Sequence, residues 1–286
     1  MRHVTRSLIV TADDVGLHRG TTLGAVAAHE GGIVTACSVV AVGRELRHAV
    51  EVLRGQPGLG VGAHLTLVDG TPLSPPAQVA SLVAANGAFL PGFAAFVRRY
   101  AAGRVRLDHV EVELRRQIET LLGAGLELTH LNSHQHLHVL PGILRVVLRL
   151  AAEYRIGYVR APVDRHRGGV GLARSLGVRA LAGLGRAARR RARACGVTTN
   201  DVTIGIAAAG HLDGARMTGL LPLAAGVTEL VCHPGRDGRS LAAALGWGYE
   251  WEAETAALCD PAMRAALDAA CITLVRPPLP GITWSR

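Results

Sequence analysis

Two adjacent carboxylates and several histidines occur at spacings that could bind a divalent metal ion. Asp13 and Asp14 follow an apolar run and precede Gly16. Adjacent side chains of a strand point to different sides, so one carboxylate could bind a metal while the other faces a bound water. The alternative is a helix N-cap, because Asp is common immediately before a helix.

The densest histidine cluster is the run HLNSHQHLH at residues 130–138. Alternate residues of an extended strand share a face, so we expect His130, His134, His136 and His138 to line one side. Imidazoles combined with a carboxylate suit Zn²⁺ or a similar borderline ion. The alternative, a surface histidine tract, fits poorly because the run follows an apolar strand and ends where Pro141 begins a helix.

Three further polar residues interrupt apolar, strand-like segments. His64 lies within residues 60–65, and His233 lies next to a Pro-Gly turn. For His64 the alternative is a buried structural histidine, and for His233 it is a strand cap. Arg160 lies in the strand-like segment 158–162. An arginine inside a barrel needs a carboxylate partner, and Asp13 is available.

Short apolar runs alternate with helical patterns along the chain, and the clusters follow the runs. The sequence predicts strands at 7–10, 34–42, 59–67, 126–134, 158–162, 202–206, 227–233 and 272–275. It predicts helices at 18–31, 45–54, 108–122, 141–154, 174–195 and 261–270. This alternation favours an α/β fold with a parallel sheet.

The chain length and the absence of a dinucleotide-binding fingerprint favour a TIM-like (β/α) barrel of seven or eight strands. The polar clusters would then meet at the mouth, where the carboxyl ends of the strands converge. We expect a single domain over residues 1–286. Residues 69–103 would be an insertion after the third strand that could act as a lid, and residues 276–286 a surface tail.

The composition excludes several classes of protein. The chain has 286 residues, 49% of them hydrophobic, so global disorder is excluded. All 31 basic residues are Arg, which excludes Schiff-base chemistry, a pyridoxal phosphate lysine and a P-loop lysine. The net charge of +9 suggests anionic partners. We expect no nucleic-acid partner, because the aromatic residues are not interleaved with Arg.

Other sequence features bear on location. The five Cys are odd in number and form no C-x-x-C pair, so we expect reduced, mostly buried thiols. We find no signal-peptide layout and no apolar run long enough to span a membrane, and we predict a cytoplasmic protein. The Arg-rich segment 174–193 could lie on an anionic membrane surface, or it could be a solvated helix face. The protein could also form a homodimer.

The segments TADDVG, GAHL, HLNSHQHLH and CHP, in this order and spacing, resemble the YdjC/ChbG family of carbohydrate deacetylases. The resemblance covers roughly residues 6 to 275. Three downstream stretches are similar to the hopanoid-biosynthesis branch called HpnK, namely residues 199–201, 226–229 and 252–267. The resemblance implies a (β/α) barrel that removes N-acetyl groups from amino sugars with a divalent metal.

Carried over position by position, the resemblance implies that Asp14, His64 and His134 are metal ligands. It also implies that Asp13 is the catalytic base and His233 the general acid. We expect Arg160 to hold Asp13 in place and keep it ionised.

We expect Asn132, His136 and His138 to contact the substrate or to support the site. Members often have NADDFG where this chain has Thr11 and Val15, and many have Asp in place of Asn132. These departures affect the substrate shape and the surroundings of the metal rather than the ligands.

The sequence therefore predicts a hydrolase that removes the N-acetyl group of an amino sugar, with one divalent ion, Zn²⁺ or Mg²⁺. The family is often described with Mg²⁺, whereas histidine-rich coordination favours a softer ion. The substrate is a small amino sugar or a lipid-linked one, such as an N-acetylglucosaminyl hopanoid. The alternatives are a metal-dependent phosphoesterase and a catalytically silent sugar-binding barrel.

Overall fold

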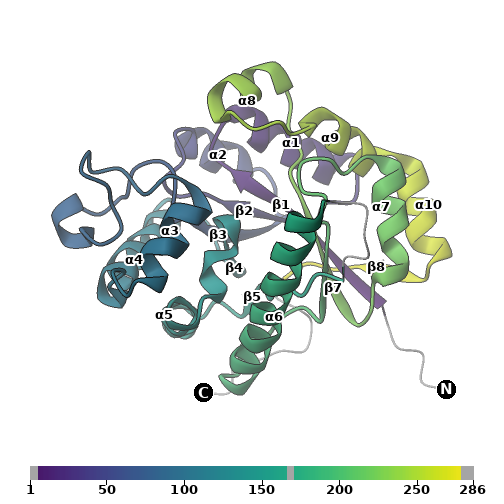
Figure 1. Ribbon diagram of the computed structural model, residues 1–286. Coiled ribbons are helices and arrows are strands. Elements are labelled where there is room, and N and C mark those ends of the chain that lie inside the picture. The colour runs from purple at the N-terminus through teal and green to yellow at the C-terminus, as the bar shows by residue number, and fades with distance from the viewer. Residues whose placement is uncertain (1–5, 166–170, 278–286) are drawn as a thin grey trace.

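The computed structural model describes residues 6–165 and 171–277, which form parallel strands joined by helices (Figure 1). Seven strands follow one another in the sheet in the order β5-β4-β3-β2-β1-β7-β6, and every neighbouring pair is parallel. Their bounds are β1 Arg6–Val15, β2 Ala36–Val39, β3 Gly60–Leu65, β4 His130–Ser133, β5 Tyr158–Val159, β6 Val202–Ile204 and β7 Val227–Cys232. The predicted α/β fold with a parallel sheet is confirmed.

The sheet curls so that its two end strands meet. Isolated parallel bridges join Tyr158 to Thr198 and Asp164 to Thr203. Between them the buried side chain of Asn200 accepts a hydrogen bond from the Ala161 N–H and donates to the Ala161 carbonyl oxygen, both at 2.8 Å. An eighth strand, β8 (Ile272–Leu274), pairs only with the start of β1. This curled parallel sheet is consistent with a (β/α) barrel.

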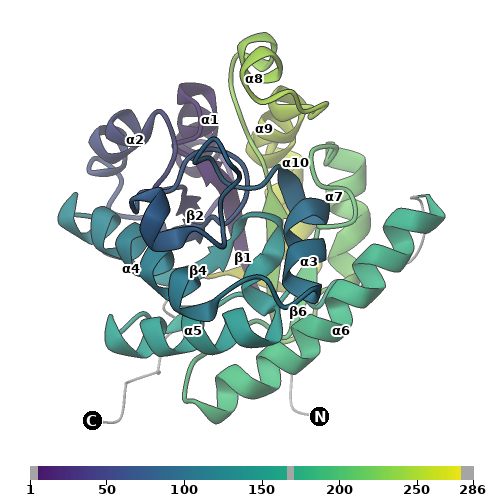
Figure 2. The same ribbon diagram turned by 60° about the vertical axis from the view of Figure 1, so that its left-hand side comes forward.

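Helices surround the sheet in both views (Figures 1 and 2). The strands are buried almost throughout, as expected for a parallel sheet covered by helices. The helices are α1 Arg19–Glu30, α2 Leu46–Leu53, α3 Gly92–Ala101, α4 Leu107–Gly123, α5 Pro141–Glu153, α6 Leu172–Ala194, α7 Gly214–Leu220, α8 Gly238–Leu245, α9 Trp251–Cys259 and α10 Pro261–Ala269. The sequence did not predict α3, α7, α8 or α9.

The expectation of one extended histidine run was wrong. The strand β4 ends at Ser133, and residues His134–Val139 form a 3₁₀ segment, η2. Within it Gln135 and His136 have φ of 53° and 56°, in the left-handed region. The four imidazoles therefore point to different places instead of sharing a face.

Other expectations have mixed outcomes. Among the free cysteines, Cys37 and Cys232 are buried, Cys259 is half-buried, and Cys195 and Cys271 are exposed, so "mostly buried" was wrong. Residues 69–103 contain α3 and a short 3₁₀ segment, η1 (Pro76–Val79). Residues 278–286 of the expected tail lie outside the described residues. Over residues 6–165 and 171–277, no helix is both long and apolar enough to cross a membrane.

Candidate metal centre

The polar clusters meet at the carboxyl ends of four strands. Asp13 and Asp14 lie near the end of β1, and His64 near the end of β3. His134 follows β4, and His233 follows β7. Because all strands are parallel, these ends lie at one edge of the sheet, where the loops of barrel enzymes build their sites.

Asp14, His64 and His134 form the one group in the described part of the chain whose ligand atoms could share a metal ion. One ligand atom of each lies within 4.8 Å of the others. The Oδ1 atom of Asp14 is 3.0 Å from Nδ1 of His134 and 3.3 Å from Nε2 of His64. Two imidazole nitrogens and a carboxylate oxygen are a donor set that suits Zn²⁺.

A bulge in β1 sets the directions of the two carboxylates. The pairing of β1 with β2 shifts between Ala12 and Val15, and Asp14 has φ of 64°. An extra residue breaks the alternation of a strand. Instead of facing opposite sides, both carboxylates reach the same imidazole: Asp13 lies 3.8 Å from Nδ1 of His64, and Asp14 lies near Nε2.

Strained backbone is concentrated around this site. Of the seven non-glycine residues with positive φ among the described residues, four border it: Asp14, Asp69, Gln135 and His136. Each such residue costs about 1–3 kcal/mol, and such strain persists where the surrounding structure enforces it, often at functional sites. The strain is therefore consistent with a site that orients its ligands at some expense of stability.

Asp13 is held by a buried guanidinium. Arg160 donates to both oxygens of Asp13, at 2.5 and 2.9 Å, as the sequence analysis expected. On its other side Arg160 donates to Oε1 of Glu229 at 2.9 Å. Glu229 also accepts hydrogen bonds from Thr11 and Tyr158, so Arg160 is fixed between two carboxylates.

The electrostatics of the site favour a cation. Burial opposes the ionisation of Asp13, but the charges of Arg160 and His64 outweigh it and hold the pKa of Asp13 below its usual range. Burial also opposes ionisation of Asp14, and His134 and His64 outweigh it and lower its pKa. Arg160 pairs with Asp13 and Glu229, whereas the printed contacts of the buried Asp14 carboxylate are with imidazoles, so a cation bound next to Asp14 would balance its charge.

His233 lies at the edge of the metal-binding group. Its Nε2 atom is 3.8 Å from Oδ2 of Asp14, and its ring meets the Tyr249 ring edge-on with centroids 5.2 Å apart. Its backbone N–H donates to Oε2 of Glu254 at 2.6 Å. Glu254 also accepts from the backbone N–H of Leu212, so this buried carboxylate ties together the loops after β6 and β7.

The three residues expected to contact the substrate have different surroundings. Asn132 is fully buried beneath the site, between Asp13 and His64. His138 is also buried, with Nδ1 bonded to Ser133 and Nε2 bonded to the Arg160 carbonyl oxygen. His136 is half-buried, and its Nδ1 has no hydrogen-bond partner among the described residues.

A cavity of about 680 Å³ opens beside His134. Its lining includes apolar residues of the loops after β2 and β3 together with Arg44, Glu45, Asp69 and Trp247. The Trp247 ring is stacked on His134, with centroids 5.6 Å apart, and Tyr249 contacts Trp247. Trp247, Tyr249, Glu229 and Glu254 were not predicted from the sequence. The only available signal for the first two was the aromatic spacing of residues 247–251.

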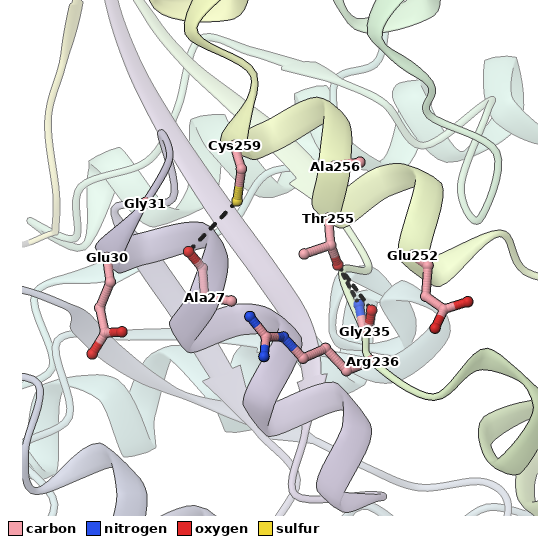
Figure 3. Close-up of a pocket in the computed structure, with 9 residues that line it drawn as sticks. All are labelled: Ala27, Glu30, Gly31, Gly235, Arg236, Glu252, Thr255, Ala256 and Cys259. Atoms are coloured by element: carbon pink, nitrogen blue, oxygen red, sulfur yellow. Dashed lines mark hydrogen bonds between the residues drawn. The ribbon is translucent and has the colours of Figure 1, made fainter.

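A second cavity, of about 650 Å³, lies between α1 and α9 (Figure 3). Glu30, Arg236 and Glu252 line it, and Thr255 is hydrogen-bonded to Gly235. Among the described residues it contains no histidine and no group that could share a metal. It is therefore not the candidate site.

Comparisons with known proteins find similar sequences and a similar fold. A family model described as YdjC-like protein matches residues 7–269. A carbohydrate deacetylase of Brevibacillus brevis is 41% identical over 149 residues, which cover 52% of this chain and 57% of that protein. The chain thus spans little more than half the length of that relative.

Two other relatives align over nearly the whole chain. A carbohydrate deacetylase of Mus musculus is 32% identical and covers 91% of this chain and 90% of that protein. A solved structure from Enterococcus faecalis V583, described as a candidate cellobiose-phosphate cleavage protein, superposes with a TM-score of 0.75. It is 24% identical and covers 95% of this chain and 97% of that chain, so it supports the fold.

Proposed function

The chain belongs to the YdjC-like protein family, and we propose that it is a metal-dependent hydrolase that removes the N-acetyl group of an amino sugar. The products would be acetate and a free amine. The observation that carries this proposal is the convergence of Asp14, His64 and His134 next to the Asp13–Arg160 pair. The names of the relatives supply a carbohydrate and the removal of an acetyl group, and the family resemblance supplies the amide.

In this proposal Asp14, His64 and His134 hold one divalent ion. When bound, the ion would activate a water molecule and polarise the amide carbonyl. The two imidazoles favour Zn²⁺ over Mg²⁺, which prefers an oxygen environment. The buried carboxylate of Asp14 supports a divalent ion of either kind.

The catalytic roles are assigned to residues on two sides of that group. Asp13 takes the proton of the attacking water, and Arg160 keeps this carboxylate ionised and oriented before the reaction. His233 donates a proton to the departing amine, which an amide needs as it leaves. Its Nε2 lies near Asp14, and its ring packs edge-on against Tyr249; both contacts support this role.

The substrate would occupy the cavity beside His134. Trp247 and the apolar lining offer a surface for a sugar ring, while Arg44, Glu45 and Asp69 offer polar contacts. Asp69 begins the segment 69–103, which we propose as a lid. His136 is half-exposed and keeps its proposed substrate contact, whereas buried Asn132 and His138 would act by positioning other groups. A phosphoesterase is less favoured, because such enzymes often use two or three ions and more ligands.

We further propose that the sugar is lipid-linked, as in the hopanoid branch, and that α6 contacts the membrane. α6 carries seven Arg and no acidic residue. Leu172 and Leu176, one turn apart, are 77% and 55% exposed. With the exposed Arg179, Arg186 and Arg190 they form one outward stripe, which suits an anionic bilayer surface. The cytoplasmic location and the homodimer stay predictions.

The reaction is tested by acetate release from N-acetylglucosamine, chitobiose and an N-acetylglucosaminyl lipid, with and without a chelator. Chelator-sensitive release from any of them supports the proposed reaction, and release from none contradicts it. Equal rates on chitobiose and on the lipid would contradict the lipid-linked substrate.

Membrane contact is tested separately by sedimentation with anionic and zwitterionic vesicles. We expect binding to anionic vesicles only. The double variant Leu172→Glu/Leu176→Glu should lose it, whereas Val112→Glu, at an exposed position of α4, should keep it. Binding unaffected by the double variant would exclude the stripe.

A further inference from the structure

A chain of buried hydrogen bonds runs beneath the site and ends at His64. It passes through Thr129, His130, Ser38 and Asn132, which come from β2, from β4 and from the residue before β4. Ser38, His130 and Asn132 are fully buried. Neither Ser38 nor His130 has a role in the proposed reaction, so the purpose of this chain needs a separate explanation.

The hydrogen bonds at the Thr129 end of this series determine which atoms donate. The Thr129 hydroxyl donates to the Val61 carbonyl oxygen at 3.0 Å, so its oxygen accepts from Nδ1–H of His130 at 2.9 Å. Burial, helped by the nearby charge of Arg160, lowers the pKa of His130 to about 3, so the ring is neutral. Its Nε2 is then an acceptor, and the Ser38 hydroxyl donates to it at 3.1 Å.

The hydrogen bonds at the Asn132 end give the same donor-to-acceptor direction. With its proton committed to His130, Ser38 accepts from the Asn132 side-chain N–H at 2.7 Å. The other N–H of Asn132 donates to Oδ1 of Asp13 at 3.0 Å, and an ionised carboxylate can only accept. Two independent neighbours therefore fix the amide orientation, and Oδ1 of Asn132 must accept from Nδ1–H of His64 at 2.7 Å.

We propose that Asn132, oriented by Ser38 and His130, is a positioning residue that commits Nδ1 of His64 to its proton and leaves Nε2 as the metal-binding atom. This inference rests on the proposed metal site. The same amide group also anchors Asp13, so one side chain sets the relative placement of the proposed ligand and the proposed base. Hydrogen bonds to the distal nitrogen of a ligating histidine commonly serve to fix its tautomer.

Two geometric details support the proposal. Nε2 of His64, the nitrogen that Asn132 does not contact, lies 3.3 Å from Oδ1 of Asp14, so it faces another of the proposed metal ligands. A Cβ at position 62 would lie 2.4 Å from the His130 ring, so Gly62 is required for this ring to lie against β3. The glycine in β3 therefore leaves room for the hydrogen-bonded His130 ring.

The experiment measures Zn²⁺ affinity by chelator competition in the full chain and its variants. Asn132→Leu removes the acceptor for His64 and should weaken binding about 10- to 100-fold, the usual effect of losing such a partner. Ser38→Ala should cause a smaller loss, which Ser38→Thr should restore. Ser74→Ala is the matched control, because Ser74 is buried and its hydroxyl has no partner among the described residues.

A spectroscopic measurement separates this role from a purely structural one. In ¹⁵N-histidine-labelled, Zn²⁺-loaded protein, His64 should carry a proton on Nδ1 and none on Nε2. Wild-type affinity and an unchanged Nδ1–H signal in both Asn132→Leu and Ser38→Ala would overturn the proposal. If Asn132→Leu does not fold, the comparison of Ser38→Ala with Ser38→Thr decides it.

A failure of the proposed metal site gives a different result. In that case the wild-type protein binds no metal, and the tautomer of neutral His64 is read in the metal-free protein at alkaline pH. A proton on Nδ1 would still support the positioning role of Asn132. A proton on Nε2 would overturn it.

Discussion

Asp14 and His134 make the shortest contact within the metal-binding group, so their loss should remove the ion. We predict that Asp14→Ala and His134→Ala each contain less than about one tenth of the wild-type metal, since a three-residue site loses an essential donor. Elemental analysis of the purified variants measures this. Asp108→Ala and His109→Ala, on α4, should keep full occupancy. Full metal content in either site variant would refute the ligand set.

Asp13 should affect the turnover rate and not the metal content. Asp13→Asn retains the shape and the contact with Asn132 but removes the proton acceptor. We predict unchanged metal content and a fall in kcat of about 10²–10⁴-fold, the usual contribution of a general base. Steady-state acetate release and metal analysis on the same sample check this. An Asp13→Asn variant with wild-type turnover would exclude Asp13 as the base.

Residue types at strand ends identified much of the candidate site from sequence. The adjacent carboxylates, His64 and His134 were found because a polar side chain is unusual in a buried strand. The bulge at Asp14 was not predictable, because a one-residue shift between strands leaves no mark in hydrophobic alternation. Glu229 and Glu254 were missed because their partners are distant in sequence.

At the scale of elements, the segment between α8 and α9 brings Trp247 to the cavity. We predict that Trp247→Ala raises KM for an N-acetyl sugar at least about tenfold, because it removes a large apolar surface from the proposed sugar site. Metal content should not change. The comparison is Trp247→Phe, which keeps an aromatic ring and should recover most of the affinity. An unchanged KM in Trp247→Ala would place the sugar elsewhere.

The seam between β5 and β6 depends on a side chain rather than on a continuous ladder. Asn200 bonds Ala161, Val202 and Thr203 there. We predict that Asn200→Leu lowers the free energy of unfolding by about 2–4 kcal/mol, since several buried polar groups lose a partner. Urea unfolding measures this. Thr218→Ala, whose exposed hydroxyl bonds only its own helix, should change it by less than about 1 kcal/mol.

The histidine run shows why element boundaries limit prediction from sequence. Its pattern is typical of a strand, yet two consecutive left-handed residues end that strand after Ser133. Non-glycine residues rarely adopt this conformation, so local propensity argues against the observed geometry. The turn places His134 near Asp14, while His130 stays in the barrel interior.

For the whole molecule, buried histidines make stability depend on pH. Burial lowers the pKa of His130 to about 3 and of His138 to about 4, and that of His136 below its usual value. Each stays neutral in the folded protein but takes up a proton on unfolding below pH 6.5. In His134 burial opposes the charged form, but the charge of Asp14 outweighs it and raises the pKa. This ring therefore releases a proton on unfolding, but only between pH 6.5 and its raised pKa.

Near pH 5 His134 is protonated both in the folded and in the unfolded protein, so it does not affect the balance. The three histidines with lowered pKa values take up about three protons on unfolding, and Glu254, whose pKa burial raises, gives up at most one. We therefore predict that the free energy of unfolding of chelator-treated protein falls by about 3–4 kcal/mol for each pH unit by which the pH is lowered near pH 5. The lowered pKa values of Asp13 and Asp14 act below about pH 4, outside this window. Urea unfolding between pH 5 and pH 6.5 measures the slope. A flat profile would contradict the burial of these rings as neutral groups.

The overall architecture was the most predictable feature. Alternating apolar runs and helical patterns gave the parallel α/β fold, since that periodicity is set by burial along the whole chain. Helices α7, α8 and α9 were missed, and α9 has apolar and polar residues spread around its circumference rather than on one face.

The central claim is that one metal ion, held by Asp14, His64 and His134, supports amide hydrolysis with Asp13. The most direct measurement is a titration of metal into chelator-stripped protein, with acetate release followed at each point. We predict activity that rises linearly and reaches a plateau at one equivalent per chain, and an Asp13→Asn protein that loads equally but stays inactive. Fully loaded wild-type protein that releases no acetate, or stripped protein that releases it at the full rate, would contradict the claim.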